Sequence, residues 1–283
     1  MLIAVRLALM LDLALLMGLP LFWWVMGMAG RRLVIFALAL GGVSTSAMWL
    51  LASASSMAGS AMMPPDWTTV RILLTLTPLG LVLAVRAMAL LIAAICAAAH
   101  RPRLALIPAA VAAATLAWTG HAGATEGMAG TLHRAADVVH IWAAAAWIGA
   151  LAVLLGTLLT LRTDMADVRR ASTMLARFSV MGTLVVLTLV ASGSINAIMI
   201  VGWERLPELV ANRYGMLLGI KLALFGLMLG LAAINRWMLT PALDGASRRS
   251  AIGRLRFSIL IETSAAMVVL ALVASLGTLD PLA

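Results

Sequence analysis

The sequence predicts an all-α membrane protein, a polytopic helical bundle of about eight transmembrane helices in one membrane domain. Hydrophobic residues make up 64% of the chain and charged residues 11%, whereas a soluble domain carries roughly 25% charge. The mean hydropathy is +1.08. A helix that crosses a bilayer needs about 20 mostly apolar residues. About eight such stretches follow one another along the chain and leave little room for a soluble domain.

The N-terminal part, residues 1–118, contains the first four of these stretches. They lie near 2–26, 33–57, 70–98 and 104–122. The first has the position of a signal peptide, but it carries Arg6 and Asp12 within the apolar run. It also ends in PLFWWVMG, without small residues at a cleavage site. We therefore expect it to remain in the protein as a helix.

The second part, residues 119–283, contains the other four stretches. They lie near 137–161, 178–202, 214–239 and 257–279. The single cysteine of the chain, Cys96, excludes an intrachain disulfide and any CxxC metal or redox motif. Any metal chemistry must therefore come from other side chains.

The arginines predict the orientation, because Lys and Arg near helix ends favour the cytoplasmic side. The first, third, fifth and seventh loops hold Arg31, Arg32, Arg101, Arg103, Arg162, Arg169, Arg170, Arg177, Arg236, Arg248, Arg249, Arg254 and Arg256, and the other loops hold Arg71, Arg134, Arg205 and Arg213. Both termini are therefore expected in the periplasm. The pI of 11.6 follows from this topology. It indicates no nucleic-acid partner, because the basic residues are spread over four short loops.

The stretch HAGATEGMAGTLHRAADVVHIWAAAAW, residues 121–147, holds three of the four histidines. A spacing of seven residues returns to within about 20° on a helix, so His133 and His140 share one face with Asp137 between them. Imidazole is the commonest metal-binding side chain, and a carboxylate one turn away can orient a ring. His121 can fold back toward the same place. The pattern predicts a metal site, although such a histidine pair also arises by simple packing at a membrane interface.

Four methionines fall in predicted outer loops, namely Met57, Met62, Met63 and Met128. Thioether sulfur selects Cu(I), and imidazole suits copper in either oxidation state. Carboxylates on this face are too few for a magnesium or calcium cage. The outer face therefore favours copper, Cu(I) or Cu(II), with these methionines as further capture residues.

Four segments of the second part resemble the bacterial copper resistance protein D (CopD) family. They are HxxxDxxHIWAAAAWIGAL at 133–151, RFSVMGTLVVLTLVASGSINA at 177–197, YGMLLGIKLALFGLMLGLAAINRWMLTPAL at 214–243 and IETSAAMVVLALVASLGTLDP at 261–281. The resemblance covers about 119–281. It departs at Ser192-Gly193, where the family pattern has Thr-Gly.

The resemblance implies a multi-pass protein of the bacterial inner membrane that takes part in copper homeostasis. It implies copper movement across the membrane, a periplasmic copper-binding partner of the CopC type, and no enzymatic activity. Two alternatives stay open. A membrane haem or redox protein would use histidines as axial ligands, and a metal-sensing subunit would bind the ion without moving it.

Polar and ionisable residues inside the predicted helices are costly in hydrocarbon and mark pairing or function. These residues are Asp12, Arg86, Lys221, Glu262, Asn196 and Asn235. By depth, Asp12 and Arg86 both fall near the midplane and are expected to pair. Such an ion pair sets helix register. The alternative is that these two residues, with Glu262, form an inner polar path below the histidines.

Overall fold

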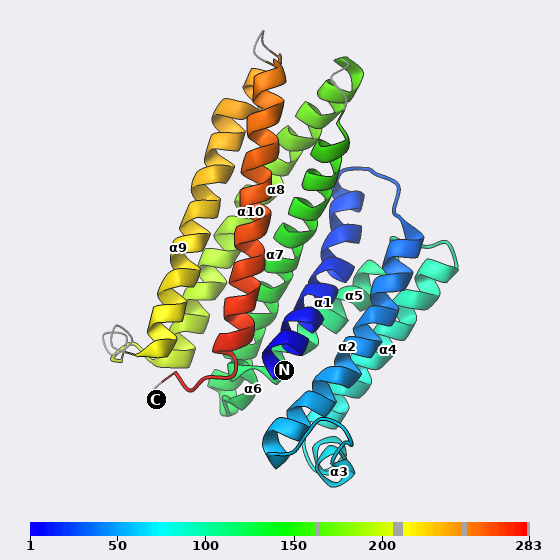
Figure 1. The fold of residues 1–283 in the computed structure, drawn as a ribbon, viewed down its shortest axis with the longest axis vertical. Helices are drawn as coiled ribbons and strands as arrows, with labels where there is room; N and C mark the ends of the chain where they lie inside the picture. Colours follow the sequence, from blue (N-terminus) through cyan, green and yellow to red (C-terminus); the bar gives the residue numbers. More distant parts are fainter. Residues whose placement is uncertain (162–164, 206–211, 245–247, 282–283) are drawn as a thin grey trace.

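The computed structural model describes residues 1–161, 165–205, 212–244 and 248–281, and in those residues it contains helices and no strand. The helices run alongside one another as a bundle (Figure 1). The long helices are α1 (Leu2–Val25), α2 (Arg32–Ala58), α4 (Leu79–Ala98), α7 (Gly127–Thr160), α8 (Met165–Val201), α9 (Arg213–Ile234) and α10 (Arg248–Leu276). The short ones are α3 (Trp67–Thr75), α5 (Leu106–Ala114), η1 (Thr115–Thr119), α6 (His121–Ala124), η3 (Asn235–Leu239) and η4 (Pro241–Asp244).

Seven helices in the described part of the chain are long and apolar enough to cross a bilayer. The expected span at 104–122 is the shorter apolar helix Leu106–Thr119, made of α5 and η1. The expectation of an all-α, polytopic membrane bundle is therefore confirmed.

Four predicted stretches have other boundaries, and two of these simply start earlier, since α8 begins at Met165 instead of 178 and α10 at Arg248 instead of 257. The stretch 70–98 is divided into α3 and α4 at Pro78, because proline lacks an N–H and disfavours helix at the residue before it. Asp66 caps α3 by accepting the backbone N–H groups of Thr68 and Thr69, and the hydrogen bond from the Thr69 hydroxyl lowers the pKa of its carboxyl. Helix α7 begins at Gly127, well before the expected 137, so the whole HxxxDxxH segment is helical.

The closest approach between the two parts of the chain is the crossing of α1 and α7. A Cβ atom built on Gly18 would lie 2.0 Å from the carbonyl oxygen of Ala145, and one on Gly149 would lie 2.2 Å from the carbonyl carbon of Gly18. The two backbones therefore touch, as small residues permit in membrane helices. Phe22 and Met26 of α1 also belong to the apolar core of α7–α10, so α1 joins the two parts into one bundle.

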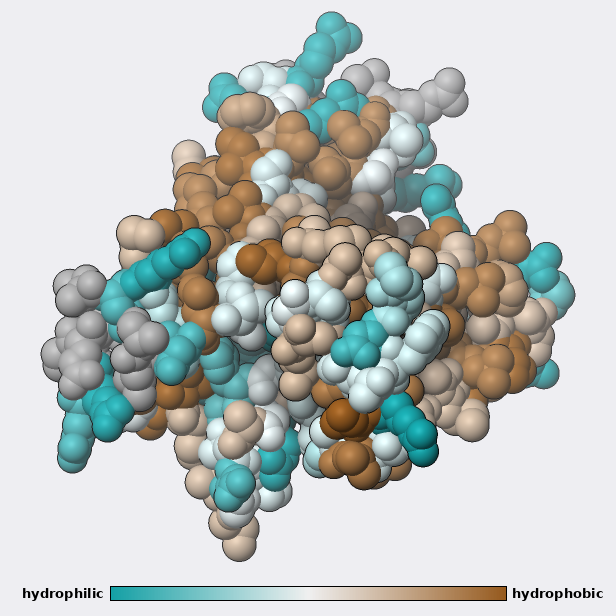
Figure 2. Space-filling model, turned by 60° about the horizontal axis from the view of Figure 1, so that its bottom comes forward, coloured by the Kyte–Doolittle hydropathy of each residue, from teal (hydrophilic) through white to brown (hydrophobic). Residues whose placement is uncertain are grey.

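Both termini lie at the same end of the bundle, together with α3 and α6 (Figure 1). Figure 2 shows this end, where hydrophilic residues gather between broad hydrophobic flanks. The loops that hold most of the predicted cytoplasmic arginines lie at the opposite end; Arg162 and the side chain of Arg248 lie outside the described residues. Termini at one end require an even number of membrane crossings, which the seven long helices and the shorter helix Leu106–Thr119 together supply. The side of the membrane on which the termini lie stays a prediction.

Candidate metal-binding face of helix α7

His133, Asp137 and His140 lie along one face of α7 that turns into the bundle. His133 is 1% exposed, and its Nδ1 is 2.9 Å from the Thr125 hydroxyl in the segment before α7. Asp137 accepts a hydrogen bond of 3.0 Å from the Asn196 amide of α8. The predicted common face is therefore present, and each of its polar groups contacts a neighbouring segment.

The hydrogen bonds of His140 favour one tautomer. Its Nδ1 lies 3.0 Å from the Ser192 hydroxyl, and that hydroxyl donates its one proton to the Thr188 carbonyl at 2.6 Å. Ser192 can then only accept, so Nδ1 of His140 carries the proton and donates it. The other nitrogen, Nε2, consequently holds the lone pair that a metal ion requires.

Ser192 and Gly193 both lie against the ring of His140. A Cβ atom on Gly193 would lie 3.3 Å from Cε1 of His140, which is tighter than ordinary van der Waals contact, so glycine leaves room for the ring. Ser192 supplies a hydroxyl, which a threonine would also supply. The departure from the Thr-Gly pattern therefore preserves the group that contacts His140.

Charged groups from three other elements surround Asp137. The charges of Lys221, His121 and Arg6 all act on its carboxyl. Arg6 of α1 also donates a 2.9 Å hydrogen bond to the Gly277 carbonyl after α10. The polar interior is therefore enclosed by α1, α6, α7, α8 and α9 together with the end of α10.

His121 lies on the short helix α6, at the edge of this interior. Its Nε2 donates to the Leu276 carbonyl at 3.1 Å, and its ring packs edge-on against Tyr214 with centroids 5.9 Å apart. His121 and His133 are close enough for their charges to interact. The fold-back of His121 toward the α7 face is thus present.

The three histidines nevertheless form a line and do not converge. His133 and His140 are two helical turns apart, about 10 Å along α7. Among the described residues, no group of three His, Cys, Asp or Glu side chains is placed to hold a metal ion. In this conformation the three rings do not form one coordination sphere, because residues seven apart share a face but not a depth. Their roles as individual ligands stay predictions.

Three of the four methionines lie at the end of α2 and in the segment after it, away from the α7 face, whereas Met128 is the second residue of α7. Met57, Met63 and Met128 are 70%, 70% and 88% exposed, and Met62 is partly buried in the segment between α2 and α3. In Figure 1 that segment and α3 lie at the α2–α4 side of the bundle, whereas α6 lies beside α7. They are reachable from water and stay predicted capture residues.

Asp12 and Arg86 form no ion pair in the described part of the chain. Arg86 is fully buried, donates from Nε to the Thr115 hydroxyl at 2.7 Å and lies over the Trp49 ring. The Asp12 carboxylate instead lies against Gly41 and Gly42 of α2. The expected pairing is wrong, because the rotation of the helices directs the two side chains toward different neighbours.

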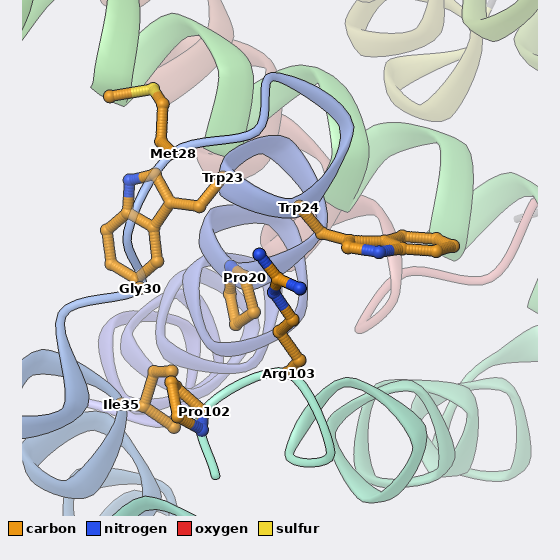
Figure 3. A pocket seen from close by; sticks show the side chains of 8 residues that line it. All are labelled: Pro20, Trp23, Trp24, Met28, Gly30, Ile35, Pro102 and Arg103. Atoms are coloured by element: carbon orange, nitrogen blue, oxygen red, sulfur yellow. The ribbon is translucent and has the colours of Figure 1, made fainter. Parts of the chain in front are cut away.

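Two surface pockets lie at the opposite end of the bundle from the histidines. Figure 3 shows one of them, lined by Pro20, Trp23, Trp24, Met28, Gly30, Ile35, Pro102 and Arg103, where the end of α1 meets the loops before α2 and α5. Its aromatic rings and prolines provide packing surface, and the Met28 thioether is its one soft metal-binding group.

Sequence reasoning missed four members of this interior, namely Thr125, Ser192, Tyr214 and Arg6. A signal for one of them was present, since Ser192 and Asn196 are four residues apart on α8 and therefore share a face. The contacts of Arg6 and Tyr214 join segments far apart in the chain, as Arg6 does with Gly277. No local pattern predicts such contacts.

Two family models match the chain. The copper resistance protein D model matches residues 172–276, and the copper resistance protein D-like N-terminal domain model matches residues 1–131. "Copper resistance protein D" of Pseudomonas syringae pv. tomato is 36% identical over 299 residues, which cover 99% of this chain and 96% of the relative.

A second relative, "Inner membrane protein YebZ" of Escherichia coli (strain K12), is 33% identical over 112 residues. These cover 40% of this chain and 37% of the relative. No solved structure matches. The likeness that the motifs showed for 119–281 thus extends along the whole chain.

Proposed function

Because the chain belongs to the copper resistance protein D family, we propose that it binds copper at the α7 face and moves it across the bacterial inner membrane. The observation that carries the proposal is the His140–Ser192–Thr188 chain, which leaves the lone pair on Nε2 of a partly buried imidazole on the interior face. Copper is the substrate of this activity. The name of the Escherichia coli relative supports the inner membrane as its location.

The path of the ion follows the line of donors. Met57, Met62, Met63 and Met128 capture copper at the surface, and His121 and His133 receive it at the mouth of the bundle. His140 lies about 10 Å deeper. A row of binding sites with two ligands each suits an ion that must leave each site as readily as it binds. Soft or borderline nitrogen and sulfur donors suit copper.

A periplasmic copper carrier of the CopC type is the proposed partner, since the exposed methionines lie at the end of the bundle where we place the periplasm. The bilayer is the other partner. No nucleotide motif is present in the sequence, so the energy must come from a gradient or from the carrier.

Copper uptake into proteoliposomes tests the function. We expect purified protein to bind copper without a Soret band and to move it into vesicles, faster when a copper-loaded carrier is supplied. A Soret band would support the haem alternative instead. Stoichiometric binding with no flux in either orientation would support the sensing subunit.

Cysteine labelling tests the proposed orientation. In a Cys96→Ser background, a membrane-impermeant thiol reagent applied to the periplasmic side should label Met128→Cys and leave Arg254→Cys unlabelled. Both positions are exposed, at opposite ends of the bundle. The reverse pattern would place the histidines in the cytoplasm and would contradict the capture role of the methionines.

A further inference from the structure

A second buried polar group lies inside the α7–α10 half, apart from the histidines. It consists of Glu262 and Ser258 on α10 and Asn235 at the start of η3, which are 2%, 5% and 6% exposed. The Asn235 amide donates to the Glu262 carboxyl. In this part of the structure, Oδ1 of Asn235 and the hydroxyl of Ser258 have no hydrogen-bond partner. Buried polar atoms without partners are rare and require an explanation.

This group lies in the half of the bundle that we assign to the cytoplasm. Glu262 is six residues, about 9 Å, beyond Arg256 on α10, and Arg256 donates to the carbonyls of Leu158 and Leu161 at the end of α7. Asn235 is about 21 Å from Lys221 along α9. The group therefore lies deep enough to be shielded from water at both ends.

An apolar layer separates this group from the histidine face. Trp147 and Phe225 pack edge-on with centroids 5.9 Å apart, and the buried Met228 follows one turn further along α9. An ion that passes the histidines must cross this layer and then meets Glu262. Glu262 is thus placed at the inner end of the proposed path.

No cation pairs with Glu262 among the described residues. Among the described side chains, the charged and titratable groups on the elements packed against α10, and on α10 itself, are Arg6 and Asp12 of α1, His133, Arg134, Asp137 and His140 of α7, Arg213, Tyr214, Lys221 and Arg236 of α9 and η3, and Arg249, Arg254 and Arg256 of α10. Arg6 donates to Gly277 and Arg236 to the Thr183 hydroxyl. A carboxylate buried without a counter-charge is very costly, so the neutral, protonated carboxyl is the stable form while the path is empty.

The local backbone allows a change at this point. Residues Asn235–Leu239 form a π-helix, in which the Asn235 carbonyl accepts from both the backbone N–H and the hydroxyl of Thr240 at 2.9 and 2.7 Å. Single π-turns are frequent at functional sites. Here the turn presents the Asn235 amide to the carboxyl of the neighbouring helix.

We propose that Glu262 is a proton-exchange site that couples copper movement to proton movement in the opposite direction. The carboxyl holds a proton while the inner half of the bundle is empty. When a copper ion enters, the O–H bond breaks, the proton passes outward along the histidine face to periplasmic water, and the cation supplies the counter-charge to the carboxylate. When the ion leaves for the inner face, the carboxylate takes up a proton from water there. Nothing is oxidised or reduced. Asn235 and Ser258 are positioning residues that orient the carboxyl. This inference rests on the proposed copper movement.

Infrared spectroscopy of the purified protein tests the protonation step without transport. The parent should show the carbonyl stretch of a protonated carboxyl, weakened when Cu(I) is added, and Glu262→Gln should lack this copper-dependent change. Gln is isosteric with the protonated acid, so folding should survive. Glu126→Gln, the same change at an exposed position, is the matched control and should keep the parent signal. A copper-dependent band that persists in Glu262→Gln would overturn the proposal.

Proteoliposomes with a pH-sensitive dye inside test the coupling. Glu262→Gln should bind copper at the histidine face as the parent does, but copper flux should fall on the order of 100-fold and proton flux should vanish, because the ion meets no counter-charge in the membrane. Equal copper and proton fluxes in variant and parent would overturn the inference. If the parent binds no copper at all, the proposed function fails, while the infrared band still reports separately whether Glu262 carries a proton.

Discussion

The variant His140→Ala is expected to lose copper binding, with an affinity loss of more than about 100-fold. A residue that hydrogen-bonds to a metal ligand and orients it typically contributes about 10–100-fold to the metal affinity. Removal of the ligand itself should reduce the affinity by more than that. His140 is the histidine whose lone pair at Nε2 is determined by its contacts, since Ser192 accepts from Nδ1 and donates to Thr188. The measurement is a Cu(I) competition titration of the purified protein against a chelator.

Three further variants test how the neighbours of the histidines contribute to copper binding. Asp137→Asn should weaken binding within the range of about 10–100-fold, because the amide lacks the charge but keeps contact with Asn196. Ser192→Thr should bind as the parent does, because the hydroxyl that holds the ring is retained. Ser192→Ala should weaken binding, because Nδ1 then loses its acceptor. Parent-like affinity in both His133→Ala and His140→Ala would mean that the histidine face serves packing alone.

The variant Gly149→Ala is expected to prevent assembly of the bundle. Overpacking of a core usually costs about 1–3 kcal/mol, and here the added methyl group would lie 2.2 Å from the backbone of Gly18, which no side-chain rotation can relieve. We therefore expect destabilisation above about 3 kcal/mol, toward the upper end for such substitutions. The measurement is the yield of folded protein in the membrane and its unfolding midpoint in detergent.

Gly156→Ala is the matched control on the same helix. A Cβ atom there meets nothing within 4 Å, so the variant should fold as well as the parent, and alanine is the better helix former by about 1 kcal/mol. Gly18→Ala should reproduce the defect from the other side of the contact, 2.0 Å from the Ala145 carbonyl. Equal stability of the Gly149 and Gly156 variants would show that α1 and α7 do not cross where the structure places them.

Local patterns predicted the helices well and their ends less well. The apolar runs correspond to the long helices, because a segment in lipid must satisfy its own backbone hydrogen bonds and therefore has helix as its available form. The break at Pro78 and the early start of α7 at Gly127 depend on capping and loop contacts, such as the bonds of Asp66 to Thr68 and Thr69. Hydropathy does not detect these contacts.

The candidate site was predictable to the extent that it lies on one helix. The seven-residue spacing of His133 and His140 placed both on one face, with Asp137 between them. That spacing also fixes a separation of about 10 Å along the axis, which prevents both from binding one ion together with His121 in this conformation. The partners from α8 could not be predicted, since they depend on how α8 is turned against α7.

By itself the sequence determined that this chain is a helical membrane protein, which of its stretches are long enough to span, and which polar residues share a helix face. Those properties depend on composition and on the helical period, which act along one segment at a time. Only the tertiary structure decided that Arg86 donates to Thr115 and does not pair with Asp12, that Ser192 accepts a hydrogen bond from His140, and that Glu262 lies against Asn235. The physical reason is that lipid and protein interior are both apolar. Hydrophobicity therefore does not set the rotation and depth of a membrane helix, which depend on close packing and on the few polar contacts between helices.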